Sequence, residues 1–268
     1  MRSAAVGSPG LQQVLSWSLG IFSHTSTELT AMHWLQKKLW QPNNRMNLLS
    51  LIQCFAAGGL LAGVALLATF AALLPELARA WEFDRVALAR GEAWRLITGH
   101  LTHWNLDHLF WDLATFLGLA TVCLRRSIRN TLTCLLGAAL AISLSIGIWQ
   151  PEIVVYRGLS GIDSALFALL AVGMLKDSCR ERNLFVFRVT LVALTGFFVK
   201  TGFEVLTGQT LFVDSAAAGF LPLASAHAVG GLVGGITAVL QDHAGHRLAG
   251  RIDRSRQPLS RVLPEQTR

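Results

Sequence analysis

Charged residues are scarce in this chain of 268 residues. Only 15% of the residues are Asp, Glu, Lys or Arg, whereas 52% are hydrophobic. Soluble domains typically carry about 25% charged residues, so this composition excludes an ordinary soluble protein. Three stretches contain no charged residue at all, and each exceeds the ~20 residues needed to cross a bilayer. They are residues 46–75, 130–151 and 215–241.

Cysteines are few, and two motifs of well-defined chemistry are absent. The cysteines lie in or beside apolar segments at spacings typical of neither a disulfide framework nor a zinc site, so we interpret them as small buried hydrophobic residues. The chain has no H-E-x-x-H motif, and its G-x-S-G motif differs from the G-x-S-x-G of an α/β-hydrolase. The four cysteines are Cys54, Cys123, Cys134 and Cys179.

Three further apolar segments carry polar or ionisable residues and complete a set of six. The sequence therefore predicts an all-α, polytopic membrane protein with a bundle of six transmembrane helices over residues 47–241. Residues 1–46 are predicted to form a poorly ordered or amphipathic cytoplasmic extension, and residues 242–268 a basic cytoplasmic tail. The three further segments cover about residues 105–124, 158–175 and 187–205.

The basic residues indicate how the chain is oriented. Of the 23 Lys and Arg residues, 17 fall in four regions that six spans would place on one side of the membrane. The positive-inside rule puts that side, with both termini, in the cytoplasm. The net charge of +7 is thereby explained by topology, so the lipid bilayer is an expected partner and nucleic acid is not. The four regions are residues 1–47, 125–129, 176–188 and 242–268.

Spans two, four and six begin at the outer face in this topology, and each carries unusual polar residues near that end. Polar groups inside a membrane are costly unless they have partners or a task. A serine hydroxyl becomes a good nucleophile only when a base takes its proton, and imidazole suits that role at neutral pH. We therefore expect Ser160 of span four and His227 of span six to meet in a hydrated pocket. Span two contributes His100, His103, His108 and Asp112.

Glycines accompany both of these residues. Gly158 and Gly161 would let the chain turn sharply into span four and leave the N–H groups at the start of that helix free to bind negative charge. In span six, Gly230 and Gly234 form a G-x-x-x-G motif, and a second such motif begins one residue later. Because these motifs let helices pack closely, spans four and six are expected to be in contact.

Each of these features also has a simpler interpretation. A serine near a helix start is often an N-cap, and a G-x-x-x-G motif often serves packing alone. The histidines of span two could instead hold a metal ion, because His108 and Asp112 have the i, i+4 spacing of helical ligand pairs. That hypothesis leaves Ser160 and His227 unexplained. A transporter or channel is a further alternative, but no paired carboxylates or basic rows indicate an ion path.

Taken together, the motifs resemble those of the rhomboid intramembrane serine proteases over about residues 82–240. The lead-in to the serine and the segment "VKTGFEVLTGQ" are further similar to the rhombosortase branch, bacterial rhomboids associated with proteins that carry C-terminal glycine-glycine sorting signals. The matching residues are Trp94, Arg95, His103, His108, Asp112, "GLSG" at 158–161 and "AHAVGGLVG" at 226–234.

The resemblance implies a serine endopeptidase that uses no cofactor or metal ion. It makes Ser160 the nucleophile and His227 the general base and later the general acid. His108, the Ser160 backbone N–H and residue 112 would line the oxyanion hole, while the fifth span and the 206–221 loop would gate access from the bilayer. Transmembrane proteins, including those with glycine-glycine tails, would be cut on the periplasmic side of a bacterial inner membrane. Supporting or structural roles fall to His103, Gly158, Gly161, Trp94, Arg95, Gly230 and Gly234.

The chain departs from the family pattern at two positions. Asp112 stands where the family usually has Asn, and an ionised carboxylate there would repel an oxyanion. Two interpretations stay open: burial keeps Asp112 protonated so that it can donate, or it pairs with a protonated His108. Ser164 stands where many rhomboids have Tyr, so a ring that would brace His227 is missing. An inactive rhomboid relative that binds transmembrane clients is therefore the alternative function.

Overall fold

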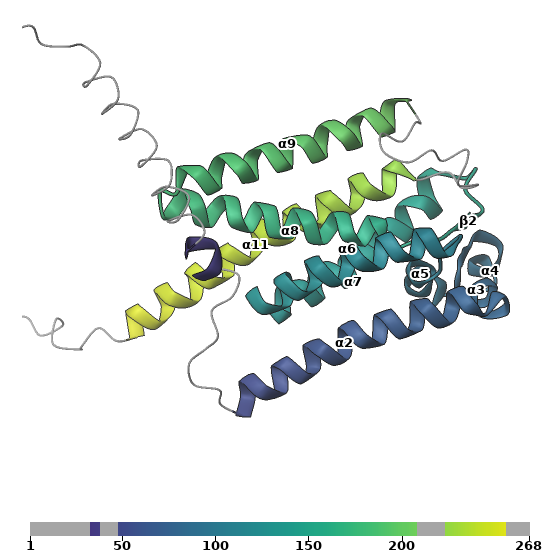
Figure 1. Ribbon diagram of the computed structural model, residues 1–268, viewed down its shortest axis with the longest axis horizontal. Helices are drawn as coiled ribbons and strands as arrows, with labels where there is room; N and C mark the ends of the chain where they lie inside the picture. Colours follow the sequence, from purple (N-terminus) through teal and green to yellow (C-terminus); the bar gives the residue numbers. More distant parts are fainter. Residues whose placement is uncertain (1–32, 38–47, 208–222, 256–268) are drawn as a thin grey trace, which may run out of the picture.

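The structure is a computed structural model that describes residues 33–37, 48–207 and 223–255. Six long helices dominate it, and each coincides with one of the six predicted apolar segments. Figure 1 shows α2 and α9 on opposite outer sides, with the other four between them. The six are α2 (Leu48–Leu73), α6 (Leu106–Arg126), α7 (Ile128–Trp149), α8 (Ser160–Arg180), α9 (Leu184–Thr207) and α11 (Ala224–Ser255).

The protein is a helical membrane protein, as the sequence predicts. Among the described helices, α6, α7, α9 and the Phe55–Leu73 part of α2 are long and apolar enough to cross a bilayer. The Ala224–Leu240 part of α11 is a shorter apolar helix. Helix α8 is more polar because Asp163 lies in its first turn and charged residues return near its end. Polar residues on a helix that other helices surround are shielded from lipid.

The predicted domain boundaries lie partly outside the described residues. Of the extension 1–46, the structure describes only the helical segment 33–37. Helix α11 continues beyond residue 241 to Ser255, so the first half of the predicted tail extends the last helix. The interpretation of every cysteine as buried is wrong for Cys179, which is exposed near the end of α8, whereas Cys123 and Cys134 are buried. Residues near helix ends project beyond the packed middle of the bundle.

Helices α8 and α11 approach each other closely through the first G-x-x-x-G motif. A Cβ atom at Gly230 would overlap the Gly161 carbonyl, lying 2.9 Å from its carbon. One at Gly234 would overlap the Ala165 carbonyl in the same way, 2.8 Å from its carbon. Only residues without a side chain allow two helix backbones to come this near. The predicted contact between spans four and six is therefore present.

The overlapping second motif faces elsewhere. A Cβ atom at Gly231 would lie 2.8 Å from the ring of Phe197 on α9, and one at Gly235 would meet nothing within 4 Å. The two motifs differ by one position, about 100° around a helix, so they cannot serve the same neighbour.

A cap of short elements gathers at one end of the bundle, between α2 and α6 (Figure 1). Within it, β1 pairs antiparallel with β2, with Phe83 opposite Tyr156 and Asp84 opposite Val155. The pairing ties the cap to the loop that directly precedes Ser160. The cap consists of α3 (Pro75–Trp81), β1 (Phe83–Asp84), α4 (Arg85–Ala89), α5 (Arg95–Thr98) and η1 (Gly99–Leu101), and β2 is Val155–Tyr156.

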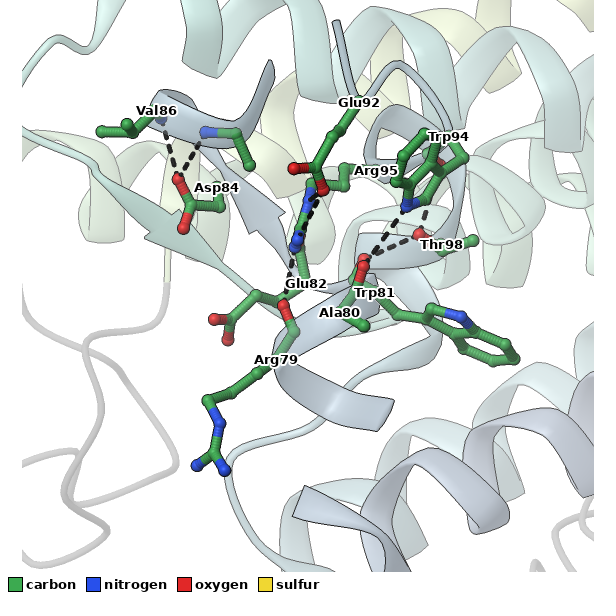
Figure 2. A network of polar contacts seen from close by, with 11 residues as sticks. Arg79, Ala80, Trp81, Glu82, Asp84, Val86, Glu92, Trp94, Arg95 and Thr98 are labelled. Carbon is green, nitrogen blue, oxygen red and sulfur yellow. Dashed lines mark hydrogen bonds and ion pairs between the residues drawn. The ribbon is translucent and has the colours of Figure 1, made fainter. Parts of the chain in front are cut away.

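The Trp94–Arg95 pair lies inside this cap, as Figure 2 shows. The buried Arg95 side chain donates to the carbonyls of Arg79 at 2.7 Å and Glu82 at 2.9 Å, and it pairs with the Glu92 carboxylate at 2.8 Å. The Trp94 indole N–H donates to a carbonyl of α3 at 3.3 Å. These contacts fold the segment after α3 back onto the end of that helix. Both side chains hold the cap together.

Arg85 joins the cap to the end of α7. Its guanidinium donates to four backbone carbonyls, three of which belong to the last turn and C-cap of α7, where the helix itself supplies few N–H donors. The distances are 2.9 Å to Ile146, 2.7 Å to Gly147, 2.6 Å to Gln150 and 3.2 Å to Ile153. A positive charge at a helix C-terminus also complements the helix dipole.

We expect Arg85→Ala to destabilise the protein by about 2 kcal/mol, because several carbonyls lose their donor together. The measurement is thermal unfolding of the detergent-solubilised chain. Arg90→Ala is the matched control, since Arg90 is an exposed arginine that ends the same short helix, α4. Equal melting temperatures for the two variants would contradict this role of Arg85.

Candidate functional site

Ser160 is the first residue of α8, and the turn before it depends on Gly158. Gly158 has φ +127°, a conformation that side chains disfavour. A Cβ atom there would also lie 3.0 Å from the His108 ring and 3.3 Å from Asp112 Oδ2. Glycine is thus needed for the backbone conformation and for the close approach of α6. The turn brings the start of α8 against α6.

Asp112 caps the amino end of α8 from the neighbouring helix. Its Oδ2 atom accepts the backbone N–H of Leu159 at 2.9 Å and that of Ser160 at 3.1 Å. Leu159, at the N-cap position, offers no side-chain cap. A carboxylate near the positive end of a helix dipole is stabilising. The buried Asp112 therefore satisfies two N–H groups that the helix itself leaves unbonded.

Two predicted histidines lie beside the same carboxylate oxygen. His108 Nε2 lies 3.2 Å and His103 Nε2 lies 3.3 Å from Asp112 Oδ2, and the two rings meet edge to face with centroids 5.1 Å apart. The His103 contact has ion-pair distance without hydrogen-bond geometry. The structure thus brings His103, His108 and Asp112 together with the backbone of Ser160.

These contacts bear on the two interpretations of Asp112. An oxygen that accepts two backbone N–H groups acts as an acceptor, and imidazole nitrogens at 3.2 and 3.3 Å are suited to an anion. The geometry favours the carboxylate paired with histidine over a protonated donor. The Ser160 backbone N–H, which the resemblance assigns to the oxyanion hole, already donates to Asp112 in this structure.

His100 lies apart from this cluster. Its Nε2 contacts the Ala139 carbonyl at 3.0 Å and the Ser143 hydroxyl at 3.1 Å, both on α7, and its ring meets Tyr156 edge to face. Burial lowers the pKa of His100 to about 4, although backbone contacts partly oppose this. A neutral, buried ring at this place packs the cap against α7. We therefore assign it no chemical role.

His227 lies near the start of α11, directly after the residue that contacts α8. A Cβ atom at Gly161 would lie 3.1 Å from the Ala226 carbonyl oxygen, so the neighbours of Ser160 and His227 touch. In the part of the chain that the structure describes, no hydrogen bond links the Ser160 hydroxyl to the His227 ring. Catalytic hydrogen bonds often form only when substrate is bound.

Glu204 of α9 is a site residue that the sequence interpretation missed. Its Oε2 atom lies 3.4 Å from His227 Nδ1, and its carboxylate also pairs with Lys200 at 2.7 Å. Glu204 is only 3% exposed. The signal in the sequence is a Lys and a Glu four residues apart within a predicted span, an arrangement that places both on one helix face.

The structure also bears on the alternative metal site and on the gating elements. Among the described residues, no group of three or more His, Cys, Asp or Glu side chains is arranged to hold a metal ion. The predicted gating loop, residues 206–221, lies outside the described residues from position 208 onwards. The fifth span itself is helix α9.

Comparisons with protein-family models, with curated proteins and with solved structures found no match.

Proposed function

We propose that the protein is a rhomboid-type intramembrane serine protease in which Ser160 is the nucleophile and His227 the general base. One observation supports this most strongly: the glycine-mediated contact of α8 with α11 puts Gly161 against Ala226. Gly161 directly follows Ser160, and Ala226 directly precedes His227, so this contact brings the serine and the histidine near each other. A serine and a histidine that two helices bring this near to each other have the residue types that nucleophilic catalysis needs.

The proposed chemistry follows from the two side chains. His227 takes the proton as Ser160 Oγ attacks the substrate carbonyl, and it later gives that proton to the leaving amine. Water then hydrolyses the acyl-enzyme with His227 again as the base. The amino end of α8 offers backbone N–H groups to the oxyanion, provided that Asp112 releases them.

The proposal includes a membrane placement. All six long helices would span the bilayer, with both termini in the cytoplasm and the cap on the periplasmic side of a bacterial inner membrane. Exposed tryptophans support a membrane surface at the cap end, because Trp concentrates at bilayer interfaces. They are Trp94, Trp104, Trp111 and Trp149, which lie in the cap, before α6, in its second turn and at the end of α7.

A fluorophosphonate probe tests the proposed nucleophile directly. We expect the solubilised wild-type chain to be labelled, and Ser160→Ala and His227→Ala to lose labelling completely while melting like the wild type. Ser164→Ala is the matched control, since this serine lies one turn along the same helix and its hydroxyl donates to the Ser160 carbonyl. Labelling that persists in Ser160→Ala would refute the assignment.

The proposed substrates are transmembrane proteins, including those with C-terminal glycine-glycine tails. Candidate tailed proteins are co-expressed with the wild-type chain or with Ser160→Ala, and their C-terminal ends are determined by mass spectrometry. Trimming that depends on Ser160 supports this substrate class. Untrimmed tails together with a labelled enzyme would redirect the search to other transmembrane proteins.

One observation favours the alternative function, an inactive relative that binds transmembrane clients. Asp112 accepts the Ser160 N–H, so the donor that an oxyanion needs is engaged. Under this alternative the chain captures transmembrane proteins in a pull-down, yet neither labels nor cuts, and Ser160→Ala captures them equally well.

A further inference from the structure

We propose that Glu204 is a positioning residue that holds the His227 imidazole in the tautomer needed for base catalysis. This inference rests on the proposed function, because it assigns a third member to the pair Ser160 and His227. The resulting chain of groups runs across three helices: the hydroxyl on α8, the imidazole on α11 and the carboxylate on α9.

The contact itself has the required chemistry. Glu204 Oε2 faces Nδ1 of His227 at 3.4 Å, and an ionised carboxylate can only accept. Nδ1 must then carry the hydrogen, which leaves Nε2 as the basic nitrogen. A base that receives the serine proton through Nε2 becomes positively charged, and the nearby anion stabilises that charge.

The placement of Glu204 is costly without such a role. A carboxylate that is 3% exposed on a membrane-spanning helix is expensive to keep ionised. Lys200, one turn earlier, lies 2.7 Å from Oε1 and 2.8 Å from Oε2, so it compensates the charge. Replacing both residues by apolar ones would remove this cost altogether. One oxygen of Glu204 also reaches the imidazole of His227, a contact that an apolar pair would lack.

A simpler role for the pair is stabilisation of α9 as an i, i+4 ion pair, which is worth about 0.5 kcal/mol on an exposed helix. That role predicts no effect on the imidazole. Removing Glu204 alone would also leave the charge of Lys200 without its partner and destabilise α9. The experiment therefore has to separate the effect on the imidazole from this loss of stability.

The experiment compares Lys200→Met with the double variant Lys200→Met/Glu204→Leu. Both lack the lysine charge, so their difference isolates the carboxylate. We expect the double variant to be labelled by the fluorophosphonate about 100-fold more slowly than Lys200→Met, because a misoriented base loses much of its catalytic contribution.

The labelling rate of Glu204→Gln should lie between those of the wild type and the double variant, since its amide oxygen still accepts the Nδ1 hydrogen without the charge. The matched control is Glu152→Gln, the same change at an exposed glutamate, with labelling at the wild-type rate.

A spectroscopic measurement reports on the imidazole independently of activity. In chain labelled with ¹⁵N-histidine, the His227 signals are identified as those missing from His227→Ala. We expect Nδ1 to carry the hydrogen in wild type and Lys200→Met, and the other tautomer to predominate in the double variant. A structural role of Glu204 would leave the tautomer unchanged.

The outcomes separate the two proposals. If wild type is not labelled, the protease assignment fails, and the tautomer measurement still decides whether Glu204 fixes the ring. If wild type is labelled and the double variant labels as fast as Lys200→Met with the same tautomer, the role of Glu204 is overturned. If the double variant does not fold, Lys200→Met/Glu204→Met, which keeps the side-chain length but has no acceptor, decides the question: labelling at the rate of Lys200→Met overturns the inference.

Discussion

Replacing Gly234 by alanine is expected to force α8 and α11 apart and to abolish fluorophosphonate labelling. The new Cβ atom would overlap the Ala165 carbonyl, a backbone group that cannot swing aside as a side chain can. Overpacking of this kind typically costs about 3 kcal/mol. Gly230→Ala should act in the same way against the Gly161 carbonyl, one residue from the nucleophile. The measurement combines thermal unfolding with the labelling rate.

Gly235→Ala provides a matched control for this prediction. A Cβ atom at Gly235 meets nothing within 4 Å, and alanine favours a helix over glycine by about 1 kcal/mol. We therefore expect Gly235→Ala to melt at or above the wild-type temperature and to label normally. If Gly234→Ala behaves like Gly235→Ala, the close contact of α8 with α11 does not hold the site together.

Asp112→Asn is expected to increase the labelling and cleavage rates by about tenfold. The carboxylate now binds the Ser160 N–H and places negative charge where an oxyanion would form. An asparagine of the same size removes that charge, and its amide N–H₂ group can donate to the oxyanion, an interaction that typically contributes more than tenfold to the rate. The gain should come with a loss of about 1 kcal/mol in stability, because α8 keeps only a neutral cap.

The measurement is the fluorophosphonate labelling rate beside a thermal melt, with Asp107→Asn as the matched control. Asp107 lies in the first turn of the same helix, α6, and is exposed, so its amide should change neither quantity appreciably. A folded Asp112→Asn protein that has lost all labelling would show that the carboxyl group itself is required.

The six long helices could be predicted from the sequence because lipid imposes a simple requirement. A stretch near 20 residues without charge has one stable conformation in a bilayer, so the charge-free segments 46–75 and 130–151 correspond to α2 and α7 within a few residues. The cap could not be predicted, because α3, α4, α5 and the two-residue strands are too short to show any periodicity.

The site was predictable only in part, for a related reason. Spacing along one helix fixes which residues share a face, so Gly230 and Gly234 could be paired with a neighbouring helix in advance. It does not fix how helices are rotated against each other. The contacts of Asp112 with the Ser160 N–H and of Glu204 with His227 each join different helices, and such contacts follow from tertiary packing alone.

The anchoring of the chain just before Ser160 determines which part of the site can adjust. Strand pairing holds that segment at Tyr156, Arg157 donates to the Glu82 carboxylate at 2.6 Å, and Asp112 fixes the first turn of α8. The backbone that carries the Ser160 hydroxyl is therefore held by the cap and by α6. In the proposed protease, the adjustment that brings the Ser160 hydroxyl and the His227 imidazole into bonding distance is therefore expected on the imidazole side, where the contact with Glu204 is long at 3.4 Å.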